Sequence, residues 1–316
     1  MGSDFTSNLR RGARLAGRLG RRAGLAVALA LALAAGAALA APAPAPPPIT
    51  PPGPTDTPEA RAAQIERDKL AGVSAFEHGD YPVARDYFRR IRQIDPADDE
   101  AMFLLGRAYL ALGDAGGAHD QFTDAVIAND KVEKYFYARA KAEVKLGRYA
   151  DALVDFKRDL DLRDGKGSST FYLSRGDANF GSGRTELAIE DYGAALDQAT
   201  PEDLRAALLH RGIALAWTKD YERALTDLDA AEAAGRAADR PVFETYFYRG
   251  VVEELKGDKA SASRDYKAAA VYDNSRKQQA ACLAAALEPP HFHLFGRSHA
   301  CDGINAAKGL QTLPPL

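Results

Sequence analysis

The chain has 316 residues, of which 46% are hydrophobic and 27% charged. It is therefore long and apolar enough to bury a substantial core, which excludes a chain that is disordered throughout. Its 41 basic and 44 acidic residues give a formal net charge of −3. Beyond the first 40 residues the chain is more acidic and has no basic stripe, which argues against nucleic acid and against an anionic membrane surface as partners.

Residues 1–40 have the pattern of a secretory signal peptide. Six arginines stand against Asp4 in the first 24 residues, and an uninterrupted apolar run follows from Leu25 to Ala40, ending in Ala-Leu-Ala. This run is shorter than the roughly 20 residues of a membrane span, which favours cleavage after Ala40 over an inner-membrane anchor at 25–40. Cleavage leaves 35 basic and 43 acidic residues, a net charge of −8. We expect an exported protein, periplasmic or secreted, that touches a membrane only if the signal is retained.

Residues 41–58 form a proline-rich linker, with nine prolines in eighteen positions. Because proline fixes φ and lacks an N–H, the composition predicts an extended polyproline II segment. At about 3.1 Å per residue it would span on the order of 55 Å. A spacer is the favoured interpretation, and a ligand for a proline-binding domain of a partner is the alternative.

Residues 65–274 repeat one pattern six times. An alanine recurs at spacings of 34, 34, 36, 36 and 38 residues, at Ala84, Ala118, Ala152, Ala188, Ala224 and Ala262. Twelve residues earlier stands a small residue: Gly72, Gly106, Ala140, Gly176, Gly212 or Gly250. Five residues earlier stands Gly79, Gly113, Gly147, Gly183, Lys219 or Gly257. Four residues after the alanine stands Phe88, Phe122, Phe156, Tyr192, Leu228 or Tyr266.

These columns predict helical hairpins. The small residue and the repeated alanine would allow two helices of about 13 residues to approach closely. The glycine between them would end the first helix, where a left-handed conformation costs glycine little. The aromatic lies on the same helical face as the alanine, and we expect it to fill the wedge against the neighbouring hairpin. A single hairpin cannot bury its apolar face, so several must stack.

This pattern resembles the tetratricopeptide repeat family, whose period is 34 residues. The resemblance covers residues 65–274, two thirds of the chain, and is clearest at 102–126, 210–231 and 248–270. It implies an all-α fold, a right-handed α-solenoid of about six hairpins within an array at 59–288. The hairpins are expected near 65–98, 99–132, 133–166, 169–202, 205–238 and 243–274, followed by a C-terminal capping helix at 275–288.

The sequence departs from the family pattern at two points. The helix-ending proline of the family appears only as Pro96, after the first repeat. Two or four extra residues separate the later repeats, near 166–168, 201–202 and 235–240. We expect all three insertions to be loops that alter the stacking twist without breaking the array.

Two further columns change character together between the second and third repeats. Repeats one and two carry Ala71 and Leu105 before the small residue, and Tyr87 and Gln121 three residues after the alanine. Repeats three to six carry arginine in the first column and aspartate in the second: Arg139 with Asp155, Arg175 with Asp191, Arg211 with Asp227, and Arg249 with Asp265. A partly buried arginine needs a carboxylate, which it can meet through two hydrogen bonds. We predict structural pairs that fix packing, within one hairpin or between adjacent hairpins.

The first helices of such an array line its inner surface. Projection of the helical period places the predicted partner-binding residues there: Phe103, Arg107, Tyr137, Lys141, Lys145, Leu209, Trp217 and Phe247. The same projection adds Lys69, Asp177, Ile213 and Glu254. An aromatic and basic groove suits an extended peptide with acidic and apolar residues. The alternative is that several of these aromatics pack between hairpins and bind nothing.

One family ligand is not implied. Chaperone-binding members hold a C-terminal carboxylate with a clamp of lysines and asparagines. Val73 and Ser174 stand where clamp asparagines would be expected.

The tail at 289–316 holds the remaining reactive side chains. Cys282, on the expected capping helix, and Cys301 are the only cysteines, and export permits a disulfide between them that would add roughly 3 kcal/mol. Three histidines, His291, His293 and His299, lie near Cys301 and Asp302, which leaves a metal-handling periplasmic protein as the alternative function. Their spacing matches no standard site, so no metal and no cofactor is predicted.

No catalytic pattern stands out in the rest of the chain. The sequence has no nucleophile elbow, no H-E-x-x-H and no phosphate-binding loop, and His78, His119 and His210 are expected to be isolated on helices. We therefore predict that the chain is not an enzyme and has no small-molecule substrate. The predicted function is a protein–protein interaction scaffold or adaptor of the bacterial cell envelope, whose concave surface binds a peptide or partner protein.

Overall fold

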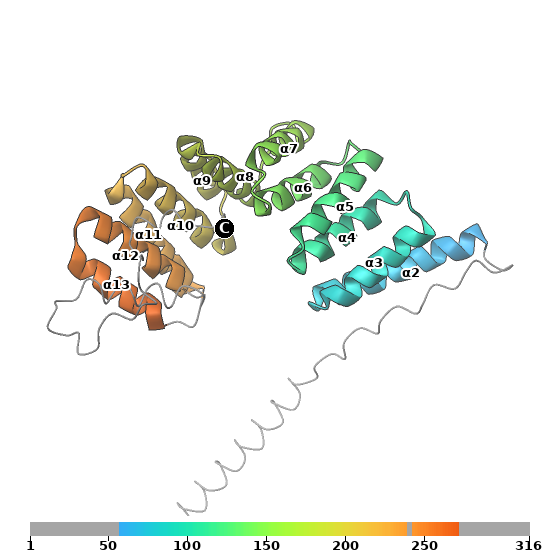
Figure 1. The fold of residues 1–316 in the computed structure, drawn as a ribbon, viewed down its shortest axis with the longest axis horizontal. Coiled ribbons are helices and arrows are strands. Elements are labelled where there is room, and N and C mark those ends of the chain that lie inside the picture. Colours follow the sequence, from blue (N-terminus) through green and yellow to red (C-terminus); the bar gives the residue numbers. More distant parts are fainter. Residues whose placement is uncertain (1–56, 239–241, 272–316) are drawn as a thin grey trace, which may run out of the picture. The chain divides into compact units, whose positions relative to one another are not determined.

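The structure, a computed structural model, describes residues 57–238 and 242–271, and every regular element in them is an α-helix. The helices are α2 Pro58–Glu77, α3 Tyr81–Ile94, α4 Asp99–Ala111, α5 Ala115–Ala128, α6 Glu133–Lys145, α7 Tyr149–Leu162, α8 Ser169–Gly181, α9 Thr185–Asp197, α10 Pro201–Trp217, α11 Tyr221–Ala237, α12 Phe243–Lys256 and α13 Lys259–Val271 (Figure 1). The all-α prediction is confirmed. The expected signal peptide, the linker up to residue 56, the capping helix and the tail lie outside the described residues.

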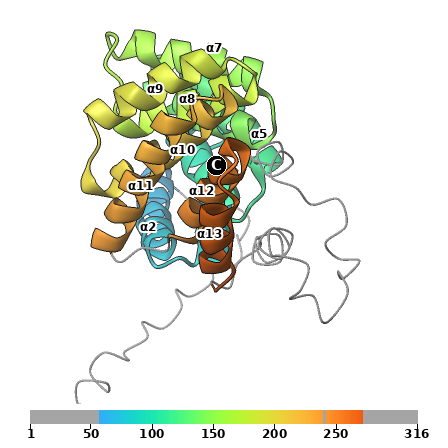
Figure 2. The same cartoon turned by 90° about the vertical axis from the view of Figure 1, so that its left-hand side faces the viewer.

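Consecutive helices pair into six hairpins, which we number 1 to 6 from α2–α3 to α12–α13, and these stack in chain order as a solenoid. The second helix of each hairpin packs against the first helix of the next. The first helices of neighbouring hairpins also contact one another: α4 with α6, α6 with α8, α8 with α10, and α10 with α12. The second helices make fewer such contacts among the described residues. Figure 2 looks onto hairpin 6, where α12 and α13 lie side by side. The first helices thus form one layer, and its solvent-facing side is called the first-helix face below.

The turns inside the hairpins depend on a residue with positive φ. Five of them use glycine in the predicted column, with φ between +73° and +98°, at Gly79, Gly113, Gly147, Gly183 and Gly257. Lys219 takes the same conformation in hairpin 5, with φ +66°. This conformation ends the first helix, and an aspartate after it caps the second in three hairpins, as Asp114 accepts from the Gly117 N–H at 2.8 Å.

The repeated alanines lie at the centre of the core, and all six are fully buried. The aromatic column packs against the small residue of its own hairpin, because the missing side chain of glycine leaves room for the ring. A Cβ built on Gly106 would lie 2.5 Å from the Phe122 ring, and one on Gly176 would lie 2.5 Å from the Tyr192 ring.

Filling the wedge between hairpins, as expected from the sequence, is therefore only part of the role of these aromatic side chains. Phe156 and Tyr192 do reach the next hairpin as well. Their ring centroids lie 5.6 Å from those of Phe171 and His210 respectively. Each of these two rings thus joins the interior of one hairpin to the first helix of the following one.

Some helix ends differ from the sequence-based expectation. Helix α2 starts at Pro58, seven residues before the expected Ile65, and the Thr57 hydroxyl caps it by accepting from the Ala60 N–H at 3.2 Å. The expected loop at 201–202 is wrong, because Pro201 is the first residue of α10, a position where its fixed φ suits a helix. The expected loop at 235–240 is wrong in part, because α11 continues to Ala237. The extra residues there lengthen helices, whereas residues 166–168 do lie in a loop.

No helix among the described residues combines the length and the apolarity needed to cross a membrane.

Candidate partner-binding surface

The eight predicted partner-binding residues differ widely in exposure. Arg107, Lys141, Lys145 and Trp217 are exposed, and Phe103 and Tyr137 are partly buried. Leu209 and Phe247 are only 2% and 0% exposed, so the prediction that they contact a partner is corrected. Helical projection gives the direction of a side chain but not how closely the adjacent hairpin covers it, and in hairpins 5 and 6 these positions belong to a shared apolar core.

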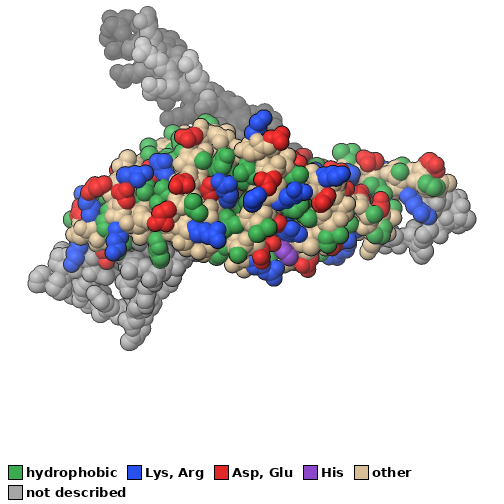
Figure 3. Space-filling view, turned by 90° about the horizontal axis from the view of Figure 1, so that it is seen from above, with side chains coloured by type: hydrophobic (Ala, Val, Ile, Leu, Met, Phe, Trp, Pro, Cys, Tyr) green, Lys and Arg blue, Asp and Glu red, His purple; other side chains and the backbone are tan. Residues whose placement is uncertain are grey.

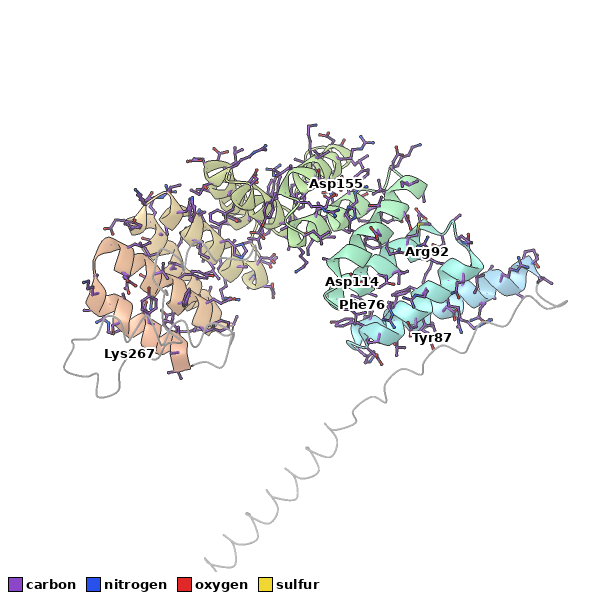
Figure 4. The ribbon with its side chains drawn as sticks, viewed as in Figure 1. Phe76, Tyr87, Arg92, Asp114, Asp155 and Lys267 are labelled. Carbon is purple, nitrogen blue, oxygen red and sulfur yellow. The ribbon has the colours of Figure 1, made fainter. Side chains whose placement is uncertain are left out.

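Three basic side chains of hairpins 2 and 3 lie over aromatic rings. The Arg107 guanidinium lies 4.7 Å from the centroid of Phe76, which stands near the C-terminal end of α2 (Figure 4), and 5.8 Å from that of Phe103. The Lys134 ammonium lies 4.9 Å from the Phe103 ring, and the Lys141 ammonium 5.6 Å from the Tyr137 ring. At these distances the ring quadrupole attracts each cation. We call Arg107, Lys134, Lys141 and Lys145 the basic surface.

No carboxylate of the described residues forms an ion pair with the basic surface. Other basic residues commonly have such partners, and over the face shown in Figure 3 Lys and Arg side chains lie interspersed with Asp and Glu side chains. The charges of the basic surface are therefore available to an anionic ligand. Phe76 and Lys134 were not predicted, although Phe76 stands four residues after Gly72 on the same side of its helix.

A second exposed feature of the first-helix face is apolar. Trp217 of α10 is 46% exposed and meets Phe180 of α8 edge to face, with ring centroids 6.1 Å apart. The two rings come from adjacent hairpins and form an aromatic patch in hairpins 4 and 5. The Tyr137 hydroxyl is already engaged within the array, because it donates to the Thr170 carbonyl at 3.3 Å and contacts the Ser174 hydroxyl at 3.2 Å.

The remaining inner-face residues take part in packing. Lys69 donates to Glu100 of the next hairpin at 2.8 Å, and Glu254 accepts from the Tyr266 hydroxyl at 2.9 Å. Ile213 is only 3% exposed. Asp177 is 8% exposed and lies in a buried group, described next.

Asp177 of α8 has one partner in its own hairpin, Tyr192, and one in hairpin 5, His210. It accepts from the Tyr192 hydroxyl at 3.0 Å and lies 2.7 Å from Nδ1 of His210. Burial and the Asp177 charge hold the pKa of Tyr192 well above its usual range. The expectation that His210 is isolated is therefore wrong, and His119 is not isolated either, since its Nε2 lies 3.5 Å from Glu143 of the next hairpin. The repeat columns give no sign of such contacts between hairpins.

The structure brings together each of the four predicted Arg–Asp pairs, and each pair links the two helices of one hairpin. Nε of Arg139 donates to Asp155 at 2.6 Å and its Nη2 donates to the other oxygen at 2.8 Å. Arg211 and Asp227 repeat this geometry at 2.7 and 2.8 Å. The remaining pairs are Arg175 with Asp191 and Arg249 with Asp265.

Burial distinguishes the two members of each pair. The aspartates are 4–9% exposed, whereas the arginine side chains are 15–27% exposed. The hydrogen bonds to Asp155 raise the pKa of Arg139. Arg249 also donates to Asp229 and Glu232 of α11, at 2.7 and 2.6 Å, so this pair extends to the adjacent hairpin.

Hairpin 1 holds a pair that the sequence columns do not show. Arg90 of the second helix donates to Asp68 of the first helix through Nε at 2.6 Å and through Nη2. Asp68 is 1% exposed and also accepts from Gln64 at 2.7 Å. The charges are reversed relative to hairpins 3–6 and lie at other positions of the repeat, so column comparison could not find them.

The predicted disulfide between Cys282 and Cys301 and the alternative metal ligands of the tail lie outside the described residues. Within residues 57–238 and 242–271, no three His, Cys, Asp or Glu side chains are grouped so as to hold a metal ion.

Two tetratricopeptide repeat family models match the chain, over residues 75–142 and 137–203. No curated protein matches it. Among solved structures, pilF of Pseudomonas aeruginosa is 14% identical with a TM-score of 0.55, and the match covers 69% of this chain and 96% of that chain. A tetratricopeptide repeat protein from Parabacteroides merdae is 16% identical with a TM-score of 0.55, covering 74% and 86%. The APC/C hetero-tetramer Cut9-Hcn1 is 17% identical with a TM-score of 0.58, covering 73% and 43%. At these identities the similarity concerns the fold.

Proposed function

Because this chain is a tetratricopeptide repeat protein, we propose that it is a non-catalytic scaffold whose first-helix face binds an extended segment of a partner protein. The observation that carries this proposal is the basic surface. Three of its four cations, Arg107, Lys134 and Lys141, lie over aromatic rings, and none of the four has a carboxylate partner among the described residues, in a chain whose acidic residues outnumber its basic ones.

The chemistry of the surface favours a segment that contains both acidic and apolar residues. Carboxylates of the partner would pair with the cations of hairpins 2 and 3. Arg107, Lys134 and Lys141 already lie over aromatic rings, which limits their freedom and so reduces the entropy lost on binding. The aromatic patch of Phe180 and Trp217 would take an apolar side chain, since large aromatics at an interface bury much area at little entropic cost.

The proposed site of action rests on the N-terminal sequence. The arginine-rich start and the apolar run of residues 1–40 support export. The proline-rich linker supports a spacer between residues 1–40 and the helical array. The partner would then be a protein of the bacterial cell envelope, met in the periplasm or outside the cell.

The test is selection of displayed random peptides on the full chain, followed by fluorescence anisotropy of the selected peptides with wild type and with K141E/K145E. We expect acidic peptides with an aromatic or aliphatic residue. Loss of two exposed charge contacts at about 1 kcal/mol each would weaken their binding about 30-fold.

The matched control is K157E/K166E, which changes the net charge equally at an exposed second-helix position and an exposed loop position. It should leave the affinity within about twofold. Selection of peptides without acidic residues, or an equal loss in both variants, would contradict the proposal.

A further inference from the structure

One position of the first helix lies beside each Arg–Asp pair. It stands three residues after the small residue of the repeat, and its occupants in hairpins 3 to 6 are Glu143, Asn179, Leu215 and Glu253. Asn179 contacts Asp191, and the charges of Asp155 and Asp265 act on Glu143 and Glu253 respectively. The pairs differ in whether this neighbour can donate a hydrogen bond, accept one, or do neither.

Hairpin 4 shows what a donor does there. The Asn179 side chain is 6% exposed, and its Nδ2 donates to Asp191 at 2.8 Å. The carboxylate therefore accepts from Asn179 in addition to Arg175, which satisfies more of its lone pairs in a buried place.

Hairpins 3 and 6 place a glutamate where hairpin 4 has this donor. Glu143 is 5% exposed, and the Oε2 atoms of both Glu143 and Glu253 are buried with no hydrogen-bond partner among the described residues. An ionised glutamate would set two negative charges side by side and leave this oxygen unsatisfied. A protonated glutamate carries an O–H, which can donate as the asparagine amide does.

We propose that Glu143 and Glu253 are protonated in the folded chain and donate through Oε2–H to Asp155 and Asp265, so that hairpins 3 and 6 loosen when rising pH removes these two protons. Each step is a simple ionisation: the proton leaves to solvent and the O–H···O bond becomes a repulsion between carboxylates. This inference does not depend on the proposed function.

The charged groups around Glu143 support protonation on balance. Burial and, next, the Asp155 charge raise the pKa of Glu143 to about 7, and Asp151 of α7 acts in the same direction. Arg139 of α6 and Arg148 before α7 oppose them. From α5, Nε2 of His119 lies 3.5 Å from Oε1 of Glu143, so a charged His119 would also favour the ionised form.

Glu253 has a similar environment in hairpin 6. Burial and then Asp265 of α13 raise the pKa of Glu253 to about 7, helped by Asp258 in the turn. Arg249 of α12 and Arg264 of α13 act in the opposite direction.

The sign of the pH dependence follows from these shifts. A glutamate whose pKa is raised by folding favours the folded state below its ordinary pKa of 4.5, and this contribution is lost as pH rises through about 7. The loss therefore falls between about pH 4.5 and pH 7, and little further change comes from these two groups at higher pH. Because α6 also carries Lys134, Lys141 and Lys145, the helix that presents three of the four residues of the basic surface would be most stable in mild acid, a consequence that does rest on the proposed function.

The direct test is a carbon-13 NMR titration of the glutamate side-chain carboxyls in the full chain, joined to melting curves at about pH 5 and about pH 8, on either side of the expected loss. We expect two carboxyls that titrate near neutral pH and disappear one at a time in E143Q and E253Q. Because glutamine donates at every pH, E143Q/E253Q should remove several degrees of the fall in melting midpoint between the two pH values.

Hairpin 4 offers the converse variant. N179E should add a third neutral-range carboxyl and steepen the fall, whereas Glu186→Gln, at an exposed position of α9, should change neither. If all glutamates of the wild type titrate below pH 5, or if E143Q/E253Q melts with the pH dependence of the wild type, the proposal is overturned.

Discussion

The Arg211–Asp227 pair of hairpin 5 allows the contribution of the Arg–Asp pairs to stability to be measured most simply. Leu215 occupies the neighbouring position, so no second side chain is seen to donate to Asp227 among the described residues. Arg211→Ala leaves a carboxylate whose side chain is only 8% exposed without its partner. Breaking a fully buried pair costs about 3–5 kcal/mol. Because the Arg211 side chain is 26% exposed, water screens part of the interaction and lowers our expectation to about 2–3 kcal/mol.

Circular dichroism at the helical minimum gives the readout. With roughly 2–4 °C per kcal/mol for a domain of this size, Arg211→Ala should lower the melting midpoint by about 5–10 °C. Arg223→Ala is the control, since this side chain is 63% exposed and its pairing with Asp220 at 3.3 Å is expected to contribute little. The double variant R211A/D227A should recover part of the loss, because it leaves no unpaired charge. Equal midpoints for wild type and Arg211→Ala would refute the reasoning.

Two further predictions concern glycine positions and are also read by thermal melting. Gly106→Ala should destabilise the fold by about 1–3 kcal/mol, because the added Cβ would lie 2.5 Å from the Phe122 ring. Gly116→Ala, whose Cβ would meet its nearest neighbour at 3.7 Å, should be neutral or stabilising; a larger loss there than at Gly106 would contradict this account of the glycine column. Lys219→Gly should stabilise hairpin 5 by about 0.5–1 kcal/mol, because Lys219 has φ +66°, and a lower midpoint would argue against strain at this turn.

The parts of the fold that recur in every hairpin could be predicted from the sequence. The turn glycines, the buried alanines and the partners of Arg139 and Arg211 were all found by comparing columns. The physical reason is that each column reports a contact inside one hairpin, and the six hairpins share that geometry. Two columns that become charged at the same repeat indicate that their residues pair, although the structure was needed to place each pair within one hairpin.

Contacts that occur once, or that lie between hairpins, could not be predicted in this way. The Asp68–Arg90 pair uses positions that are not repeated, and the group formed by Asp177 and His210 depends on the fit of hairpins 4 and 5. Burial of Phe247 has the same origin, because the neighbouring hairpin covers a side chain that helical projection places on the surface. The sequence therefore predicted the exposed cations Arg107, Lys141 and Lys145 of the candidate surface. It could not predict which of the apolar residues beside them are buried.

Helix α10 shows how an insertion can mislead. Proline, threonine and acidic residues near Pro201 are typical of loops, yet the same residue types begin helices, where proline fits the first turn and acidic side chains favour the positive end of the helix dipole. Residue type alone therefore does not distinguish a loop from the first turn of a helix. In this chain the extra residues near Pro201 lengthen α10.

The most direct test of the binding proposal is hydrogen exchange of the full chain with and without a selected acidic peptide at saturating concentration. We expect added protection concentrated on α4, α6 and the C-terminal ends of α8 and α10, where the basic surface and the aromatic patch lie. Protection confined to the second helices α5, α7 and α9, with the first helices unchanged, would contradict it.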